Sequence, residues 1–307
     1  MKWPEELNFM MNARLPQKRS THNLEGQVVL VTGATSGVGL QVMKEVLKHH
    51  GKVIMISRNQ TKAESIISSF DEFSKSRIES FYADFRNLDD IKKVAKLICN
   101  QVDKIDVIVN SAGIHNTKKV ILKNGFEEVL TVNHLAPFLL TSLLLPLKPQ
   151  RIILVSSEGH RFSDFSLQNP YFTKKRYTGL KGYGAAKTAQ LHTVYVLAEY
   201  MSSRGITVNA VHPGEVKSNI GMNNGVIYKV FKKIFINPFL KPVARSGEAI
   251  YYHISSPDLK ENTGLFYNLT NEELPAKHAR KSKRSFEIFD WTCDQLGIDF
   301  KEVLNNV

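Results

Sequence analysis

The stretch Gln27–Gly39, QVVLVTGATSGVG, decides the fold of this 307-residue chain. Its segment Val28–Val31 is a continuous apolar run, which is typical of a strand buried on both faces of a sheet. Three glycines follow, and a helical pattern of apolar residues comes directly after them. Strand, glycine turn and helix in this order predict a cradle for phosphate groups, because glycines let the backbone approach a ligand closely. A flexible glycine–serine loop between two elements is the alternative.

The spacing of this turn, TGxxxGxG over residues 32–39, resembles that of the short-chain dehydrogenase/reductase family. It differs from the GxGxxG pattern of the long-chain dehydrogenases. The resemblance implies a dinucleotide whose pyrophosphate lies against the turn. The first cofactor-binding candidates are therefore Gly33, Thr35, Ser36, Gly37, Val38 and Gly39.

The composition limits the possible partners and chemistry. The only two cysteines, Cys99 and Cys293, lie far apart without metal-ligand spacing, so we expect no disulfide framework and no metal site. The net charge of +12 can indicate nucleic acid, an anionic membrane surface or a phosphate-rich cofactor. No basic run carries the interleaved aromatic residues of a nucleic-acid platform, so we expect no nucleic-acid partner.

Targeting signals are not evident in the sequence. No apolar run reaches the roughly 18 residues that a membrane-spanning helix needs. The first twenty residues contain acidic residues and prolines but no apolar core, which argues against a secretory signal and a transit peptide. We expect a cytoplasmic protein, and contact with a membrane surface stays open. Residues 1–24 are predicted to be an N-terminal extension.

The second predicted strand, Lys52–Ser57, ends where dinucleotide-binding folds select their cofactor. An acidic residue at this point hydrogen-bonds the ribose 2′-OH of NAD, whereas a basic residue accepts the 2′-phosphate of NADP. Here Ser57 and Arg58 stand without an acid, and a guanidinium matches a phosphate well. The sequence therefore predicts NADP(H), with a solvated surface arginine as the alternative.

Two further strand ends supply cofactor candidates by resemblance. The third predicted strand spans residues 78–85, and family members place an aspartate there beside the adenine ring, which corresponds to Asp84. Capping of the next helix, together with Asn87, is the alternative role. The fourth predicted strand, residues 105–109, is followed by an NSAG stretch where the family usually has NNAG. Small residues there let a ribose and nicotinamide approach the backbone, which makes candidates of Asn110, Ala112 and Gly113.

A nearly all-apolar helix is predicted over residues 126–145, and it contains Asn133. Family members carry an asparagine here that joins a proton-relay water to the active site. Hydrogen bonding between helices is the alternative, since a buried amide must be paired. The fifth predicted strand, residues 151–155, ends in Ser156 and Ser157, and by resemblance Ser157 faces the substrate. A polar turn at the strand end is the alternative.

A tyrosine followed four residues later by a lysine completes the family's catalytic set, and spacing alone does not select one pair. Tyr183 and Lys187 are favoured because they open a long helical pattern, and because residues four apart share one face of a helix. Small residues between them leave room for a cofactor, and by resemblance both also contact it. The four pairs with this spacing are Tyr171/Lys175, Tyr177/Lys181, Tyr183/Lys187 and Tyr228/Lys232.

The sixth predicted strand, residues 206–211, is followed by a proline–glycine turn. By resemblance this turn closes over the nicotinamide side, with Gly214 and Val216 as contacts. Family members use the following region as a substrate lid, here around residues 217–242. Its mixture of basic and apolar residues also suits docking at a membrane surface, and a lid packed on its own protein is the alternative.

Strands alternate with helices from residue 27 to 268, which predicts an α/β fold with one doubly wound Rossmann-type parallel sheet and helices on both faces. We expect one domain over residues 25–307 that ends in a C-terminal tail. The motifs VNHLAPFLLT, VSSEGH and VHPGEVKSNI resemble retinol-dehydrogenase-like members. Family members often form dimers, so a homodimer stays open.

The resemblance implies an NADP(H)-dependent oxidoreductase that interconverts a carbonyl and an alcohol on an apolar substrate such as a retinoid, steroid or other lipid. Tyr183 would exchange the proton, Lys187 would lower the pKa of the phenol, and Ser157 would stabilise the substrate oxygen. A protein on the same fold that binds NADP(H) without turnover, as a redox sensor or partner protein, is the alternative.

Overall fold

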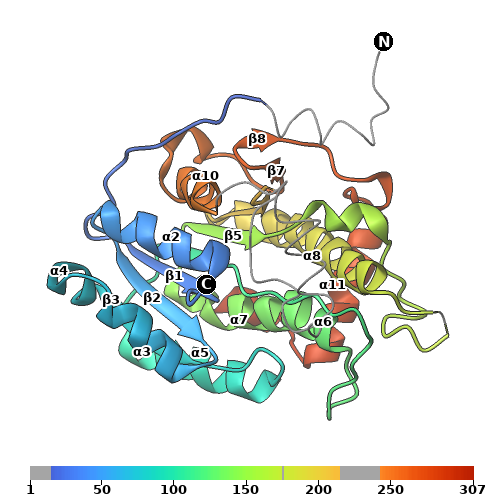
Figure 1. Ribbon diagram of the computed structural model, residues 1–307. Coiled ribbons are helices and arrows are strands. Elements are labelled where there is room, and N and C mark those ends of the chain that lie inside the picture. The colour runs from blue at the N-terminus through green and yellow to red at the C-terminus, as the bar shows by residue number, and fades with distance from the viewer. Residues whose placement is uncertain (1–14, 175, 215–242) are drawn as a thin grey trace, which may run out of the picture.

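The computed structural model describes residues 15–174, 176–214 and 243–307, and these form one sheet with helices on both faces (Figure 1). The strand order is β3-β2-β1-β4-β5-β6-β7-β8. Neighbours are parallel from β3 to β7, whereas β8 pairs antiparallel with β7. The predicted doubly wound sheet is confirmed. The strands are β1 (Val28–Thr32), β2 (Lys52–Ser57), β3 (Ile78–Tyr82), β4 (Val107–Asn110), β5 (Arg151–Val155), β6 (Thr207–His212), β7 (Phe266–Asn268) and β8 (Asn271–Glu272).

The chain order reverses at β1, which lies between β2 and β4, and ligands of such sheets bind at this point beyond the strand ends. Alternating strand residues face two separate apolar clusters, for example Leu30 on one side and Val29 on the other. Helices α2 and α10 pack together over the second side. The helices are α2 (Gly37–Lys48), α3 (Gln60–Ser68), α4 (Glu72–Lys75), α5 (Leu88–Gln101), α6 (Glu128–Leu130), α7 (Ala136–Leu144), α8 (Gly179–Ser202), α10 (Ala244–Ser255), α11 (Lys283–Leu296) and α12 (Phe300–Asn305).

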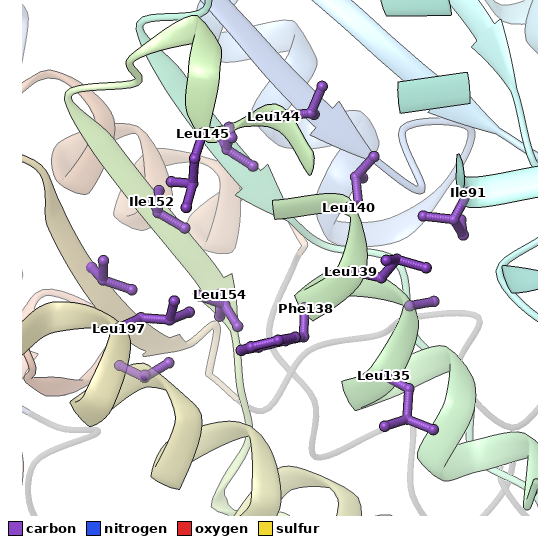
Figure 2. Packing of buried hydrophobic residues seen from close by; sticks show 14 of the residues in the cluster. Ile91, Leu135, Phe138, Leu139, Leu140, Leu144, Leu145, Ile152, Leu154 and Leu197 are labelled. Atoms are coloured by element: carbon purple, nitrogen blue, oxygen red, sulfur yellow. The ribbon is translucent and has the colours of Figure 1, made fainter. Parts of the chain in front are cut away.

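The largest cluster lies between the sheet and the layer formed by α5, α7 and α8. Figure 2 shows side chains of α7 between Ile91 of α5, Leu154 of β5 and Leu197 of α8. Full burial of one such side chain contributes about 1.5–3 kcal/mol. The stretch Glu128–Leu147 is long and apolar enough to cross a membrane, but 89% of its apolar window is buried inside the protein. It is therefore a core segment of this fold.

The structure corrects three predicted boundaries. The single helix expected over residues 126–145 is divided, because a wider π-helical turn, η2 (Thr131–Leu135), separates α6 from α7. The third strand ends at Tyr82 and not at residue 85. Helix α8 begins at Gly179, one turn before Tyr183, because the Thr178 side chain caps its first turn by accepting from the Lys181 N–H.

The described part of the N-terminal extension lies along α10 and the β7–β8 turn (Figure 1). The Gln17 side chain accepts hydrogen bonds from the N–H and the hydroxyl of Thr270, at 3.1 and 2.9 Å. The Tyr251 hydroxyl donates to the carbonyl of His22, and Leu24 is fully buried. This extension is therefore attached to the last part of the sheet.

Candidate active site

The glycine turn after β1 is built by close contacts that only glycine permits. A Cβ on Gly39 would lie 2.7 Å from the carbonyl oxygen of Gly33, and Gly33 itself has a φ of +69°. The Thr32 hydroxyl accepts from the N–H groups of Ser111 and Ala112, both at 2.9 Å, and so joins this turn to the loop after β4. Thr32 was not among the predicted site residues.

Helix α2 starts at this turn with its N–H groups available. Ser36 is the N-cap but makes no capping hydrogen bond, and Gly37 opens the helix with a φ of +57°. Thr35 and Val38 flank these two residues in the same turn. The first turn of a helix of 12 residues attracts an anion through its free N–H groups and its dipole. The turn can therefore hold a pyrophosphate.

The end of β2 carries an unsatisfied polar group. Ser57 is only 5% exposed, and its hydroxyl has no partner among the described residues. Arg58 follows it and is exposed. A buried hydroxyl without a partner is costly in a folded protein, so a ligand that supplies the missing hydrogen bond fits this position.

Asp84 does not cap the next helix, since Asn87 does so by accepting from the Asp89 N–H. Its carboxylate forms an ion pair with Arg86, at 2.5 Å. Burial alone would raise the pKa of Asp84. The hydrogen bonds from Arg86 and the nearby charge of Arg58 nevertheless hold this pKa below its ordinary value. The pair places a cation and an anion beside the end of β3.

The loop after β4 is held by two buried amides. Asn110 donates from its side chain to the Thr141 hydroxyl at 2.8 Å, and its own Oδ1 has no partner among the described residues. The Asn133 side chain pairs with the backbone of Ile114 in both directions, each at 2.8 Å. A Cβ on Gly113 would lie 3.1 Å from the Asn133 Oδ1. The Asn133 side chain therefore clamps this loop and does not bond another helix.

Ser157 and Tyr183 both lie close to Gly159. The Ser157 hydroxyl accepts a hydrogen bond from the Gly159 N–H at 3.0 Å. A Cβ on Gly159 would lie 2.6 Å from Cε1 of Tyr183 and 3.2 Å from the Ser157 hydroxyl. The missing side chain thus lets the phenol ring pack directly on Gly159, two residues after the serine. The ring of His115 packs edge-on against Tyr183, with 5.6 Å between the ring centroids.

Lys187 is buried one turn further along α8. Its ammonium donates to the carbonyl of Val155 at 2.7 Å and to Oε1 of Gln190 at 3.3 Å, and lies 6.0 Å from the centroid of the Tyr183 ring. Burial disfavours the charged form and lowers the pKa of Lys187 to about 7. The two residues of this pair and Ser157 therefore lie at one strand end.

Two other tyrosines of the Tyr–Lys pairs are engaged elsewhere. The Tyr177 hydroxyl donates to the Glu127 carboxylate at 3.3 Å, and burial raises its pKa. The Tyr171 hydroxyl donates to Gln295 at 2.7 Å, and burial raises its pKa to about 12. Lys175, Tyr228 and Lys232 lie outside the described residues.

His160 supports the serine and was not predicted from the sequence. The N–H of Ala276 donates to its Nε2 at 3.1 Å, so Nδ1 carries the proton and donates to the Ser157 carbonyl at 2.8 Å. Burial lowers the pKa of His160 to about 3, which keeps the ring neutral. The only sequence signal was its place in the VSSEGH motif.

The turn after β6 is only partly described. Gly214 has a φ of +80°, and a Cβ there would lie 3.0 Å from the Leu269 side chain. Val216 and the predicted lid around residues 217–242 lie outside the described residues.

Comparisons with known proteins agree with this architecture. The family model described as short chain dehydrogenase matches residues 27–226. The chain is 28% identical to a WW domain-containing oxidoreductase of Gallus gallus, over 87% of this chain and 67% of that protein. It is 26% identical to human retinol dehydrogenase 13, over 96% of this chain and 91% of that protein. A crystal structure of an uncharacterised protein from Mycobacterium paratuberculosis superposes with a TM-score of 0.73 at 22% identity, covering 91% of this chain and 96% of that one.

Proposed function

From the premise that this chain belongs to the short-chain dehydrogenase family, we propose that it is an NADP(H)-dependent oxidoreductase that interconverts a carbonyl and an alcohol. The observation that carries the proposal is the approach of the Ser157 hydroxyl and the Tyr183 ring to the same point beside Gly159, with the Lys187 ammonium one helical turn away. A phenol, a hydroxyl and a buried cation at one strand end suit acid–base chemistry on a carbonyl oxygen.

Each of these side chains has a distinct task. A nicotinamide cofactor, when bound, supplies or accepts the hydride. Tyr183 gives a proton to the carbonyl oxygen during reduction and takes it back during oxidation. A free phenol titrates near pH 10, and the cationic form of Lys187 favours the phenolate and so lowers that value.

Ser157 supplies a hydrogen bond to the substrate oxygen. A hydroxyl has one donor and two acceptor positions, and the Gly159 N–H occupies one acceptor position. Its donor is therefore available for the oxygen on which negative charge develops. His160 holds the Ser157 carbonyl and keeps this hydroxyl in place.

The residues present fit a dinucleotide with a 2′-phosphate. The glycine turn and the start of α2 suit a pyrophosphate, and the partnerless Ser57 hydroxyl with the exposed Arg58 suits an anionic group beyond β2. No acidic residue stands at the end of β2 to bind a ribose 2′-OH in the manner of NAD-dependent members.

For the substrate we propose a small apolar aldehyde or ketone, or the matching alcohol, such as a retinoid, steroid or other lipid. The similarity to human retinol dehydrogenase 13 supports this class. We also propose that residues 25–307 form one domain with residues 1–24 as an extension and residues 217–242 as a substrate lid. Contact with a membrane surface from the cytoplasm and a homodimer stay predictions, tested by liposome sedimentation and light scattering.

The test is oxidation of NADPH and NADH with retinal, a steroid ketone, a straight-chain aldehyde and a hydrophilic aldehyde. We expect turnover with NADPH and an apolar carbonyl, and Arg58→Asp should reverse or erase the preference for NADPH. Lys52→Asp, at the opposite end of β2, makes the same charge change and should keep the preference. Equal use of NADH by the wild type contradicts the cofactor assignment, and NADPH binding without turnover supports the non-catalytic alternative.

A further inference from the structure

Gln190 is a buried amide between two residues of the candidate active site. It follows Lys187 by three positions on α8 and is only 2% exposed. Its Oε1 accepts from the Lys187 ammonium at 3.3 Å, and its Nε2 donates to the backbone carbonyl of Asn133 at 3.1 Å. An ammonium can only donate and a carbonyl can only accept, so these two partners fix the orientation of the amide.

We propose that Gln190 is a positioning residue that holds the Lys187 ammonium and links it directly to the Asn133 carbonyl. The inference rests on the proposed function, because it gives Gln190 a role through Lys187. The family pattern assigns the connection between Asn133 and the active site to a water molecule. In this chain the Gln190 side chain makes the connection, so the Asn133 carbonyl is already bonded.

The contacts of Lys187 explain why such a residue is needed. Lys187 is 3% exposed, and its ammonium has three donors, of which Val155 and Gln190 take two among the described residues. One donor remains for a ligand. Loss of the Gln190 side chain would leave a second donor and the Asn133 carbonyl unpaired in a buried place, where each unpaired polar group is costly.

The charge state of Lys187 depends strongly on these neutral partners. Two other ionisable groups interact with it in the described part of the chain, Tyr183 on the same helix and His134 on η2. Burial and the Lys187 charge lower the pKa of His134 to about 3, so this ring stays neutral. The ammonium also donates a hydrogen bond to the Val155 backbone carbonyl on β5. The amide of Gln190 is therefore the neutral side chain through which a substitution can change the pKa of Lys187.

The experiment compares Gln190→Leu and Gln190→Glu. Leucine removes the acceptor and lowers the pKa of Lys187, whereas a carboxylate raises it. Each shift should be about one to two pH units, the size expected for a hydrogen bond to a charged group. The first readout is the melting temperature of the protein without ligands between about pH 5 and 10, a range that includes the expected shifts in both directions. The rise of stability that accompanies deprotonation of Lys187 should move to lower pH in Gln190→Leu and to higher pH in Gln190→Glu.

The second readout is the pH profile of NADPH oxidation, in which the loss of activity at rising pH should move in the same two directions. Thr193→Val is the matched control, because its buried hydroxyl on the same helix donates only to the Gln190 backbone carbonyl. It should lower stability without moving either profile. Parallel losses of stability in both Gln190 variants, with unmoved profiles, would overturn the proposal. Since the first readout needs no turnover, absence of enzyme activity would refute only the proposed function.

Discussion

The two halves of helix α8 differ in almost every respect although they form one continuous element. The first half, residues 179–190, is built of small residues around Tyr183, Lys187 and Gln190. Its glycines meet other segments so closely that any side chain would collide, as at Gly184 against the Gly159 carbonyl. The second half, residues 191–202, fills the core with Leu191, Val194, Leu197 and Met201.

This contrast shows that the second half of α8 stabilises the protein and that the first half destabilises it. Glycine in a helix interior costs about 1 kcal/mol relative to alanine, and a buried ammonium costs more. The apolar second half offsets these costs by burying side chains in the largest cluster of the protein. We therefore expect substitutions in the first half to change chemistry and those in the second half to change stability.

The largest expected effect separates two tyrosines of the same helix. Tyr183→Phe should reduce turnover by roughly 10²–10⁴-fold, because it removes the proposed general acid and base while the ring remains. Tyr195→Phe removes an equivalent hydroxyl from the buried second half and should leave turnover within about twofold of wild type, since general acid–base help is not lost. Single-turnover NADPH oxidation measures the rate of both variants. Similar losses in the two would contradict the division of α8 into a chemical first half and a structural second half.

The next effect concerns stability alone. Leu197→Ala should lower the free energy of unfolding by about 2–5 kcal/mol, because Leu197 is 1% exposed and its loss leaves a cavity in the cluster of Figure 2. Urea denaturation gives this value. Turnover per folded molecule should be unchanged, and a drop in it would mean that the core of α8 also sets the geometry of the site.

A smaller effect is the pH dependence of stability. The pKa of Lys187 is about 7 in the folded protein and near 10.5 in the unfolded chain. Between these values the unfolded chain binds more protons, so unfolding becomes less favourable as pH rises, by at most about 1.4 kcal/mol per pH unit. Lys187→Met should flatten the rise measured between pH 7 and 9. Lys181→Met, an exposed lysine in the first turn of α8, should keep it.

The smallest expected effect tests the close contacts of the first half. In Gly184→Ala, the Cβ placed 2.7 Å from the Gly159 carbonyl oxygen forces the backbone to shift, and this cost outweighs the better helix propensity of alanine, so the free energy of unfolding should fall by about 1 kcal/mol. Turnover should fall several-fold because the displaced Gly159 segment carries Ser157. Ser202→Ala, in the exposed last turn, should change neither quantity. Unchanged turnover in Gly184→Ala would show that the segment around Gly159 shifts without displacing Ser157.

The sheet could be predicted because its signals are local. Each buried strand is a short apolar run, and the turn after Val28–Thr32 carries its glycines within a few positions. The pair Tyr183 and Lys187 was favoured for the same reason, since the helical pattern lies beside it in the sequence. The fold and the family are confirmed, whereas the roles of the site residues stay predictions.

The site features that could not be predicted from the sequence depend on contacts between distant parts of the chain. Thr32 bonds a loop 79 residues away, His160 accepts from a backbone N–H 116 residues away, and Gln190 bonds a carbonyl 57 residues away. Gly179 lies between Tyr177 and Lys181, yet it belongs to α8, where a Cβ would lie 2.7 Å from the Asn116 carbonyl oxygen. A glycine that is needed for close approach has the same sequence signal as one that breaks a helix.

The attachment of the N-terminal extension to the β7–β8 turn has a consequence for synthesis on the ribosome. Gln17 bonds Thr270, which is 253 residues further along the chain. At roughly 5–20 residues per second, Gln17 waits on the order of 10–50 seconds for this partner to be made. During that interval α10 and the last strands have not yet been made, so the extension has no docking partner and stays open to chaperones. Translation speed over the residues between Gln17 and Thr270 therefore sets how long the extension of the newly made protein remains undocked.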